Sequence, residues 1–201
     1  MLEDIQLRVA GIADCYCVAK VHKSIFADHL LGRLPVWLIQ RYYVCLCKVG
    51  ALMIVAENND GQGVGFVLGG QSGILNRGKK AFLMRWWWAF GTCVLMDRIA
   101  WRLFEHTYLQ RASSAETGGK SSYSMRLLSI GVKKDMQGSG VAWALLSYFE
   151  AILKTDHSIS GYGLSVHSDN ARAIRFYQKN GFEVEAITGM STYLGKRLDR
   201  L

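Results

Sequence analysis

The sequence predicts an α/β fold with a central mixed sheet flanked by helices. Strand and helix patterns alternate after residue 125, and the helical pattern of Gly140–Leu153 lies between two strand patterns. A helix between two strands is the usual crossover of a parallel pair, so we expect at least one such pair in the sheet. The 201 residues are 50% hydrophobic, which is enough for one domain, residues 1–201, with a substantial core.

The N-terminal part predicts one strand, two helices and a hairpin. Ile5–Val9 alternates like a strand, and Asp14 stands where it can cap a helix that runs through Cys17–Phe26. The turn residues of segment 58–61 separate two short apolar runs, which predicts a β-hairpin. The second helix is expected over about Val36–Cys47, and the hairpin strands over Ala51–Glu57 and Val64–Gly70.

The part after residue 125 predicts four strands and two helices. Apolar residues at helical spacing mark both helices, and Gly181 is placed to end the second one. The strands are expected at Met125–Val132, Gly163–Val166, Phe182–Ile187 and Thr192–Leu198, and the helices at Gly140–Leu153 and Asn170–Asn180.

Residues 73–122 predict a hydrophobic, basic helical insertion, as one long or two shorter helices, that ends in a Ser/Gly-rich loop at 112–122. Residues 74–111 carry seven basic and two acidic side chains, a net +5 of the +8 of the chain. The uncharged run Trp86–Met96 has eleven residues, whereas crossing a bilayer takes about twenty. Three roles stay open: a helical pair that forms a homodimer contact or a lid, a membrane-surface contact through 74–111, or binding of an anionic acceptor.

Net charge and cysteine content set further expectations. A net charge of +8 favours an anionic partner such as a phosphorylated cofactor. The five cysteines are an odd number and the first residues do not read as a secretion signal, so we expect a cytoplasmic location, with peripheral membrane attachment as the alternative. The pairs Cys15/Cys17 and Cys45/Cys47 lie in predicted helices, where residues two apart face different ways, so we expect structural thiols and no metal.

A glycine-rich turn follows the strand Met125–Val132. The sequence Gln137-Gly138-Ser139-Gly140 leads into a helix, whose first N–H groups have no partner inside it. Glycines let an anion approach these N–H groups, and the helix dipole adds positive potential. The turn therefore predicts a phosphate or pyrophosphate site. A P-loop does not fit, because no Gly-Lys-Ser/Thr follows.

Two motifs together resemble the GNAT superfamily of N-acetyltransferases. Gln137-x-x-Gly140-x-Ala142 is similar to the acetyl-CoA motif of that family, (Q/R)-x-x-G-x-(G/A). About thirty residues later the second motif, N-x-x-A-x-x-x-Y-x-x-x-G-F, is matched by Asn170, Ala173, Tyr177, Gly181 and Phe182. The close resemblance covers residues 125–198, and the N-terminal elements agree with the family in order only.

The resemblance implies an N-acetyltransferase that uses acetyl-CoA as cosubstrate and a small-molecule or peptide amine as acceptor. The acceptor amine would attack the thioester directly, Tyr177 would protonate the leaving thiolate, and Asn170 would bind the pantetheine or a water near it. The pantetheine arm would pair with the strand edge at Ile130 and Val132, where Gly131 is placed to let the backbone bend. The pyrophosphate would lie on the loop amides of Gln137, Gly138, Ser139, Gly140, Val141 and Ala142.

The general base is open at this point. Many relatives have a glutamate where this chain has Arg126, which cannot accept a proton. Glu57, Ser129, His167 and a water chain are the candidates, and we favour the water chain. The alternative function is a non-catalytic acyl-CoA-binding or membrane-associated regulatory module. Nucleic-acid binding is disfavoured, because no basic stripe alternates with exposed aromatic residues outside the insertion.

Overall fold

A computed structural model of the chain describes residues 4–104 and 122–199. Within these residues, seven strands form one sheet in the order β1-β2-β3-β4-β5-β7-β6, and only the β4–β5 pair is parallel. The predicted mixed sheet is therefore confirmed, as is the parallel pair. The strands are β1 (Ile5–Val9), β2 (Leu52–Asn58), β3 (Gly63–Gln71), β4 (Met125–Val132), β5 (Gly161–His167), β6 (Glu183–Thr188) and β7 (Ser191–Arg197).

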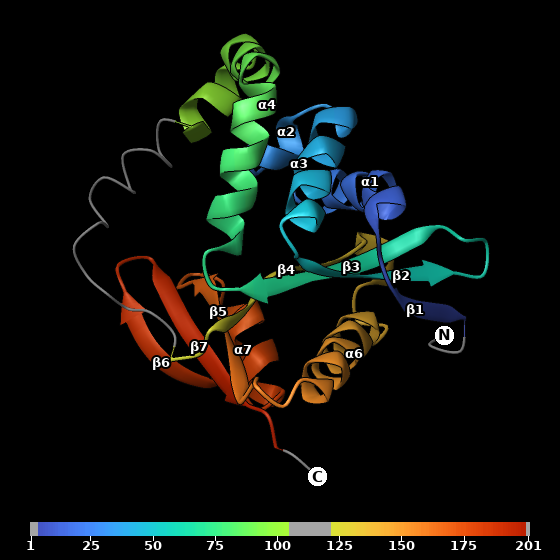
Figure 1. Ribbon diagram of the computed structural model, residues 1–201, viewed down its shortest axis with the longest axis vertical. Coiled ribbons are helices and arrows are strands. Elements are labelled where there is room, and N and C mark those ends of the chain that lie inside the picture. Colours follow the sequence, from blue (N-terminus) through green and yellow to red (C-terminus); the bar gives the residue numbers. More distant parts are fainter. Residues whose placement is uncertain (1–3, 105–121, 200–201) are drawn as a thin grey trace.

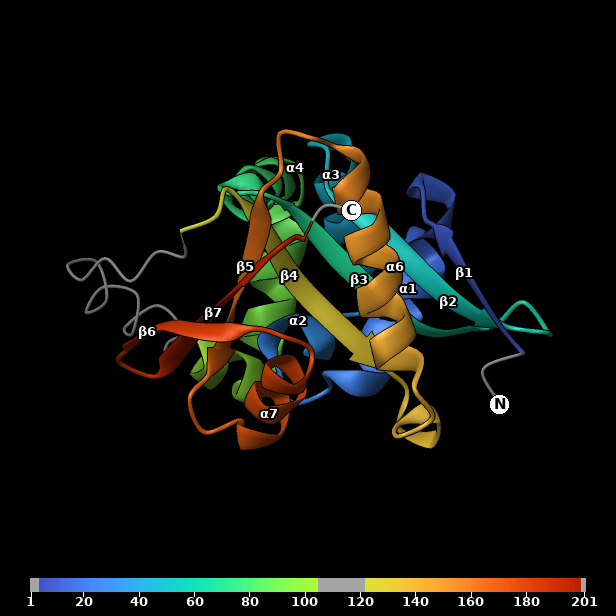
Figure 2. The same ribbon diagram turned by 90° about the horizontal axis from the view of Figure 1, so that it is seen from below.

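Helices cover both faces of the sheet, as Figure 1 shows, and the view of Figure 2 places α6 across the strands. Four helices lie on one face: α1 (Cys15–Ile25), α2 (Leu30–Arg33), α3 (Val36–Lys48) and α4 (Ile74–Met96). The crossover helix α6 (Val141–Thr155) and α7 (Ala171–Lys179) lie on the other. Short 3-10 turns precede α1 at Ile12–Asp14 and α6 at Lys134–Met136.

The core has two layers, one on each face of the sheet. Leu38 and Tyr43 of α3 and Phe66 of β3 belong to the first layer, and Phe149 of α6 and Tyr162 of β5 to the second. Every residue of β3 except the last is buried, which is why Val64–Gly70 reads as a continuous apolar run.

Asp14 occupies the N-cap position of α1, but its side chain does not cap the helix. Both carboxylate oxygens accept hydrogen bonds from Arg8, at 3.0 and 2.7 Å. Arg8 also donates to both oxygens of Glu57 on β2, at 3.0 and 2.7 Å. The expected cap is therefore wrong, because a charged partner on β1 takes the carboxylate that the helix N–H groups would use.

One cysteine of each Cys-x-Cys pair meets the other across two helices. Cys15 Sγ of α1 lies 3.8 Å from Cys47 Sγ of α3, and burial together with the neighbouring thiol raises the pKa of Cys15. Within residues 4–104 and 122–199, no three His, Cys, Asp or Glu side chains gather in a way that could hold a metal ion. The pair therefore packs α1 against α3.

The insertion begins as α4, which packs on α3 and breaks its helical geometry once, at Trp86. Residues 98–104 are again helical, so the described part of the expected insertion consists of two helices. Arg33 holds Asp97, between these helices, through an ion pair of 2.7 Å. In the described part of the chain, no helix is both long and apolar enough to cross a membrane. The loop expected at 112–122 lies outside the described residues, except for Ser122.

Candidate active site

The parallel strands β4 and β5 separate soon after they meet. They pair only at Met125 with Tyr162 and at Arg126 with Gly163. Beyond this point, no strand among the described residues pairs with β4 on its β5 side from Leu127 onward, whereas its other side stays paired with β3. The gap leaves strand N–H and C=O groups available to an extended ligand, as a missing strand would.

The irregularity in β4 lies at Leu128 and not at Gly131. Leu68 pairs with Ser129 and Gly69 with Leu127, so Leu128 is the extra residue of a bulge. A Cβ on Gly131 would lie 3.0 Å from Ile25 and 3.2 Å from Phe26. The register of β4 shows no shift at Gly131, and its missing side chain lets the end of α1 approach the strand.

The glycine-rich turn after β4 leads into α6 as predicted. Gly138 and Gly140 have φ values of +85° and +91°, which are strained for any residue with a Cβ. Gly140 is the N-cap, so the N–H groups of Val141, Ala142 and Trp143 open the helix without partners inside it. These N–H groups make the turn suitable for binding an anion.

A cleft of about 790 Å³ occupies the gap between β4 and β5 and ends at this turn. Eight of the ten residues predicted to bind the cofactor line it. They are Ile130, Val132, Gln137, Gly138, Gly140, Ala142, Asn170 and Tyr177. The other two are not in its lining: Val141 is fully buried, and Ser139 Oγ donates a hydrogen bond to Met136 O at 2.6 Å. Val141 can contribute to the site only through its backbone, whereas the Ser139 N–H already donates a hydrogen bond to Met136 O at 3.4 Å.

Gln137 connects the two walls of the cleft. Its Nε2 donates to Val132 O at the end of β4, at 3.4 Å, and its Oε1 accepts from Arg172 Nη1 of α7, at 3.2 Å. Arg172 also lines the cleft and brings a positive charge opposite the glycine-rich turn. The sequence analysis missed Arg172. Its position two residues after the cap Asn170 is the signal that could have found it, because the first turn of α7 faces the cleft.

Asn170 lines the cleft and also caps α7. Its Oδ1 accepts a hydrogen bond from the Ala173 N–H at 3.1 Å, as an N-cap side chain does. This bond fixes the start of the helix that carries Arg172 and Tyr177. The capping role and the predicted contact with the ligand are compatible, because the amide nitrogen of Asn170 stays available as a donor.

Tyr177 is 5% exposed and lies on α7 between two aromatic rings. Its ring meets those of Phe176 and Phe182 edge to face, with centroids 5.3 Å apart in each case. Burial raises the pKa of the phenol, so Tyr177 keeps its proton throughout the neutral range. A protonated phenol at the wall of a cleft can donate a proton or a hydrogen bond to a bound ligand.

The candidate general bases differ in whether they reach the cleft. Ser129 and His167 line the cleft, and His167 Nδ1 lies 3.5 Å from Asp169 Oδ2. Glu57 does not line the cleft. It lies on β2, next to β1, and its carboxylate accepts hydrogen bonds from Arg8. Of the three candidate side chains, the structure therefore brings only Ser129 and His167 to the cleft.

Several other residues that the sequence analysis did not select as site residues also line the cleft, among them Ile25, Phe26, His29 and Trp143. The first three come from the end of α1 and the segment before α2. No local pattern marks them, because they reach the cleft only when α1 packs over Gly131.

Comparison with known families and structures agrees with this architecture. The model of the family described as Acetyltransferase (GNAT) domain matches residues 49–184, which is more than half of the chain. A comparison with curated proteins gave no significant match. The chain has an acetyltransferase fold with a cleft that opens where the parallel strands β4 and β5 separate. It belongs to the GNAT acetyltransferase family.

Solved structures share the fold over nearly the whole chain. The PaiA N-acetyltransferase of Thermoplasma acidophilum, in complex with coenzyme A, is 17% identical with a TM-score of 0.59, covering 96% of this chain and 98% of that one. The ribosomal-protein-S18-alanine N-acetyltransferase of Escherichia coli is 14% identical with a TM-score of 0.58, covering 98% and 96%. YncA of Salmonella typhimurium, with its cofactor acetyl-CoA, is 17% identical with a TM-score of 0.57, covering 98% and 95%.

Proposed function

We propose that this protein transfers an acetyl group from acetyl-CoA to a primary amine by direct attack in a ternary complex. The observation that carries the proposal is the cleft between β4 and β5, which joins an unpaired strand edge, a helix N-terminus and the buried phenol of Tyr177. Each matches one part of the cosubstrate: the pantetheine amides, the pyrophosphate and the sulfur.

In the proposed complex the strand edge at Ile130 and Val132 pairs with pantetheine. The N–H groups at Gly138 to Ala142, with Arg172 opposite, hold the pyrophosphate. No protein group needs to become acetylated in this arrangement.

The reaction then requires two proton movements. The amine nitrogen attacks the thioester carbonyl, a C–N bond forms and the C–S bond breaks. The proton of the attacking amine passes to a water chain, and the thiolate takes the proton of the Tyr177 hydroxyl, which solvent restores. Tyr177 is protonated when the thiolate leaves, because burial raises the pKa of its phenol.

Thiol release from acetyl-CoA, measured over a panel of primary amines, tests the proposal. We expect amine-dependent release of CoA by the wild-type protein. The alternative is a non-catalytic acyl-CoA-binding or membrane-associated regulatory module. Calorimetric binding of acetyl-CoA without turnover of any amine would support that module and contradict the proposed reaction.

A further inference from the structure

The face of the sheet that carries α1–α4 continues beyond them onto β5, β7 and β6. Arg126 pairs with Gly163 of β5, and Gly163 pairs with Gly195 of β7. Both glycines are buried. Because they have no side chains, the residues that flank them in this row can approach one another across the two strands.

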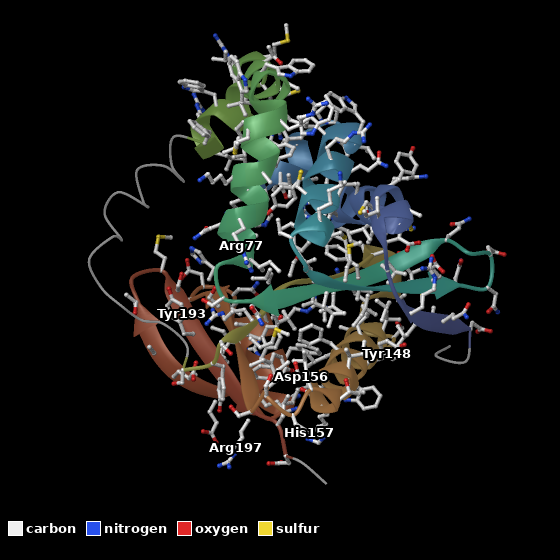
Figure 3. All side chains as sticks on the ribbon, in the orientation of Figure 1. Arg77, Tyr148, Asp156, His157, Tyr193 and Arg197 are labelled. Carbon is white, nitrogen blue, oxygen red and sulfur yellow. The ribbon has the colours of Figure 1, made fainter. Side chains whose placement is uncertain are left out.

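Glu185 lies at the other end of this row. It is the extra residue of a bulge in β6, since Val184 pairs with Leu194 and Ala186 with Tyr193. The bulge turns its carboxylate over the neighbouring strand, where a Cβ on Gly195 would lie 2.5 Å from Glu185 Cδ. Arg126 and Glu185 therefore face each other across Gly163 and Gly195. We call this row of residues, with Tyr193 beside it (labelled in Figure 3), the Arg126 trough.

Arg126 carries a half-buried charge with no ion pair within 4.0 Å among the described residues. Its guanidinium lies over the ring of Tyr193, 5.9 Å from the ring centroid. Burial lowers the pKa of Arg126 from its ordinary value, although the charge of Glu185 acts in the opposite direction. A guanidinium in such surroundings has lost part of its hydration and gains most from an anion that accepts two of its N–H groups.

Glu185 limits which anion fits. Its Oε1 accepts a hydrogen bond from the Ser122 N–H at 3.2 Å, while its Oε2 is buried and accepts none from the described residues. Glu185 already places one negative charge near Arg126, so a dianionic phosphate would meet more repulsion there than a single carboxylate would. The trough therefore favours a carboxylate over a phosphate.

The trough is continuous with the candidate active site. Arg126 immediately precedes Leu127, a residue of the cleft lining, and the Arg126–Gly163 pair is the last before β4 and β5 separate. Ser165 also lines the cleft and pairs with Tyr193 of the trough. An acceptor whose amine lies at the thioester in the cleft can place a nearby carboxylate at Arg126.

We propose that the Arg126 trough binds the carboxylate of the acceptor, so that the substrate class is small amines that also carry a carboxylate, as amino acids do. This inference rests on the proposed acetyl transfer. It assigns Arg126 to acceptor binding, at the position where many relatives have a glutamate.

The inference is tested by comparing amino acids with the corresponding amino-acid amides as acceptors, at saturating acetyl-CoA. We expect kcat/KM to favour the acids about tenfold or more, and Arg126→Gln to remove that preference mainly through KM. Arg126→Lys keeps the charge but not the planar guanidinium, so it should retain part of the preference for acids. Arg197→Gln, at an exposed arginine on the same sheet, should keep the full preference.

Equal kcat/KM for acids and amides, or an unchanged preference in Arg126→Gln, would overturn the assignment while leaving acetyl transfer intact. If acetyl-CoA binds but no acceptor turns over, the affinities of N-acetylglycine and N-acetylglycinamide for the CoA complex are compared by calorimetry. Equal affinities would contradict carboxylate binding by the Arg126 trough. Absence of acetyl-CoA binding would overturn the proposed function and this inference with it.

A second, independent observation concerns the end of the insertion that projects away from the sheet in Figure 1. Its exposed apolar side chains form what we call the Trp-rich tip: Leu83, Met84, Trp87, Trp88, Leu95, Met96, Ile99 and Trp101. Met96 is 90% exposed, Trp87 68% and Trp88 55%. So many large apolar side chains together on one surface indicate that the surface meets an apolar partner.

Charge identifies the kind of partner. Lys80, Arg85, Arg98 and Arg102 are exposed along the same helices. Asp97 is the single acidic residue of segment 74–104, and the ion pair with Arg33 neutralises it. Tryptophan beside arginine and lysine suits the boundary between lipid headgroups and acyl chains, where the rings enter and the cations meet anionic headgroups.

We infer that the Trp-rich tip binds the surface of membranes that contain anionic lipids. Flotation with vesicles of phosphatidylcholine and 30% phosphatidylglycerol (a composition we choose, about one anionic lipid in three) tests this against phosphatidylcholine alone. We expect flotation only with the anionic vesicles and a loss of about tenfold in a Trp87→Ser/Trp88→Ser double variant. Trp143→Ser, at an exposed tryptophan of α6, is the matched control and should float like the wild type.

Equal flotation of the wild type and the double variant, or none with anionic vesicles, would overturn the inference. A concentration-dependent dimer that disappears in the double variant, without flotation of the wild type, would assign the tip to a second copy of this chain instead.

Discussion

Arg172 of α7 donates a hydrogen bond to Gln137, with 3.2 Å between Nη1 and Oε1, and so joins the two walls of the candidate active site. Gln137 belongs to the turn after β4, whereas Arg172 follows the cap of a helix more than thirty residues later. The bond brings a positive charge to the side of the cleft opposite the helix N-terminus of α6.

This relationship predicts that Arg172→Ala weakens acetyl-CoA binding. We expect a loss of about five- to tenfold at low salt, since both the charge and the orientation of Gln137 are lost. The loss should shrink as salt rises, because screening weakens the charge term first. Calorimetric titration at two salt concentrations measures it. Arg175→Ala, at an exposed arginine of α7 outside the cleft lining, should bind as the wild type does, and an equal loss there would contradict the role of Arg172.

Gly140 should be more sensitive to substitution than another glycine of similar backbone geometry. Gly140 has φ +91° and Gly61, in the turn between β2 and β3, has φ +71°. An alanine costs about 1–2 kcal/mol of unfolding free energy at either position. We expect only Gly140→Ala to weaken acetyl-CoA binding as well, because its turn presents the N–H groups of α6. Chemical denaturation and calorimetry together measure both effects, and unchanged affinity in Gly140→Ala would argue against the anion site.

His22 predicts a pH dependence of stability. Its Nδ1 lies 2.8 Å from Tyr43 Oη, and its buried Nε2 has no partner among the described residues. Burial lowers the pKa of His22 from 6.5 to about 4. The unfolded chain therefore binds a proton near pH 6.5 that the folded chain refuses until about pH 4, so stability falls as the pH drops between these values.

We expect the wild type to lose roughly 2 kcal/mol of unfolding free energy from this group between pH 7 and pH 4.5. His22→Asn keeps a polar partner for Tyr43 and cannot be protonated, so its curve should be flatter over the same range. Urea denaturation at several pH values measures both, with His157→Asn, at an exposed histidine, as control. Parallel curves for wild type and His22→Asn would show that His22 does not cause the dependence.

The order of strands and helices could be predicted from the sequence because it depends on local signals. The alternation of Ile5–Val9, the turn before Val64 and the cap Asn170 each appear within a few residues. The short helix α2 and the break in α4 at Trp86 could not be predicted in this way. Asp14 shows the limit most clearly, since its local pattern indicates a cap and a distant arginine decides otherwise.

The candidate site could also be predicted only where local signals mark it. The motif spacing placed Gln137, Gly140 and Tyr177, and all three line one cleft. The separation of β4 from β5 and the arrival of Phe26 beside Gly131 depend on packing between distant segments, which no single segment encodes. The opposition of Arg126 and Glu185 likewise depends on strand register and on a bulge in β6.

The role of Tyr177 in acetyl transfer is tested most directly by the pH profile of amine-dependent thiol release in Tyr177→Phe. The phenol packs between rings and its pKa is raised by burial, so the variant should fold and bind acetyl-CoA as the wild type does. We expect kcat of Tyr177→Phe to be about 100-fold lower than that of the wild type, as for loss of a general acid. The rate of the wild type should not decline up to about pH 10. Unchanged kcat in Tyr177→Phe, with acetyl-CoA bound, would contradict the account.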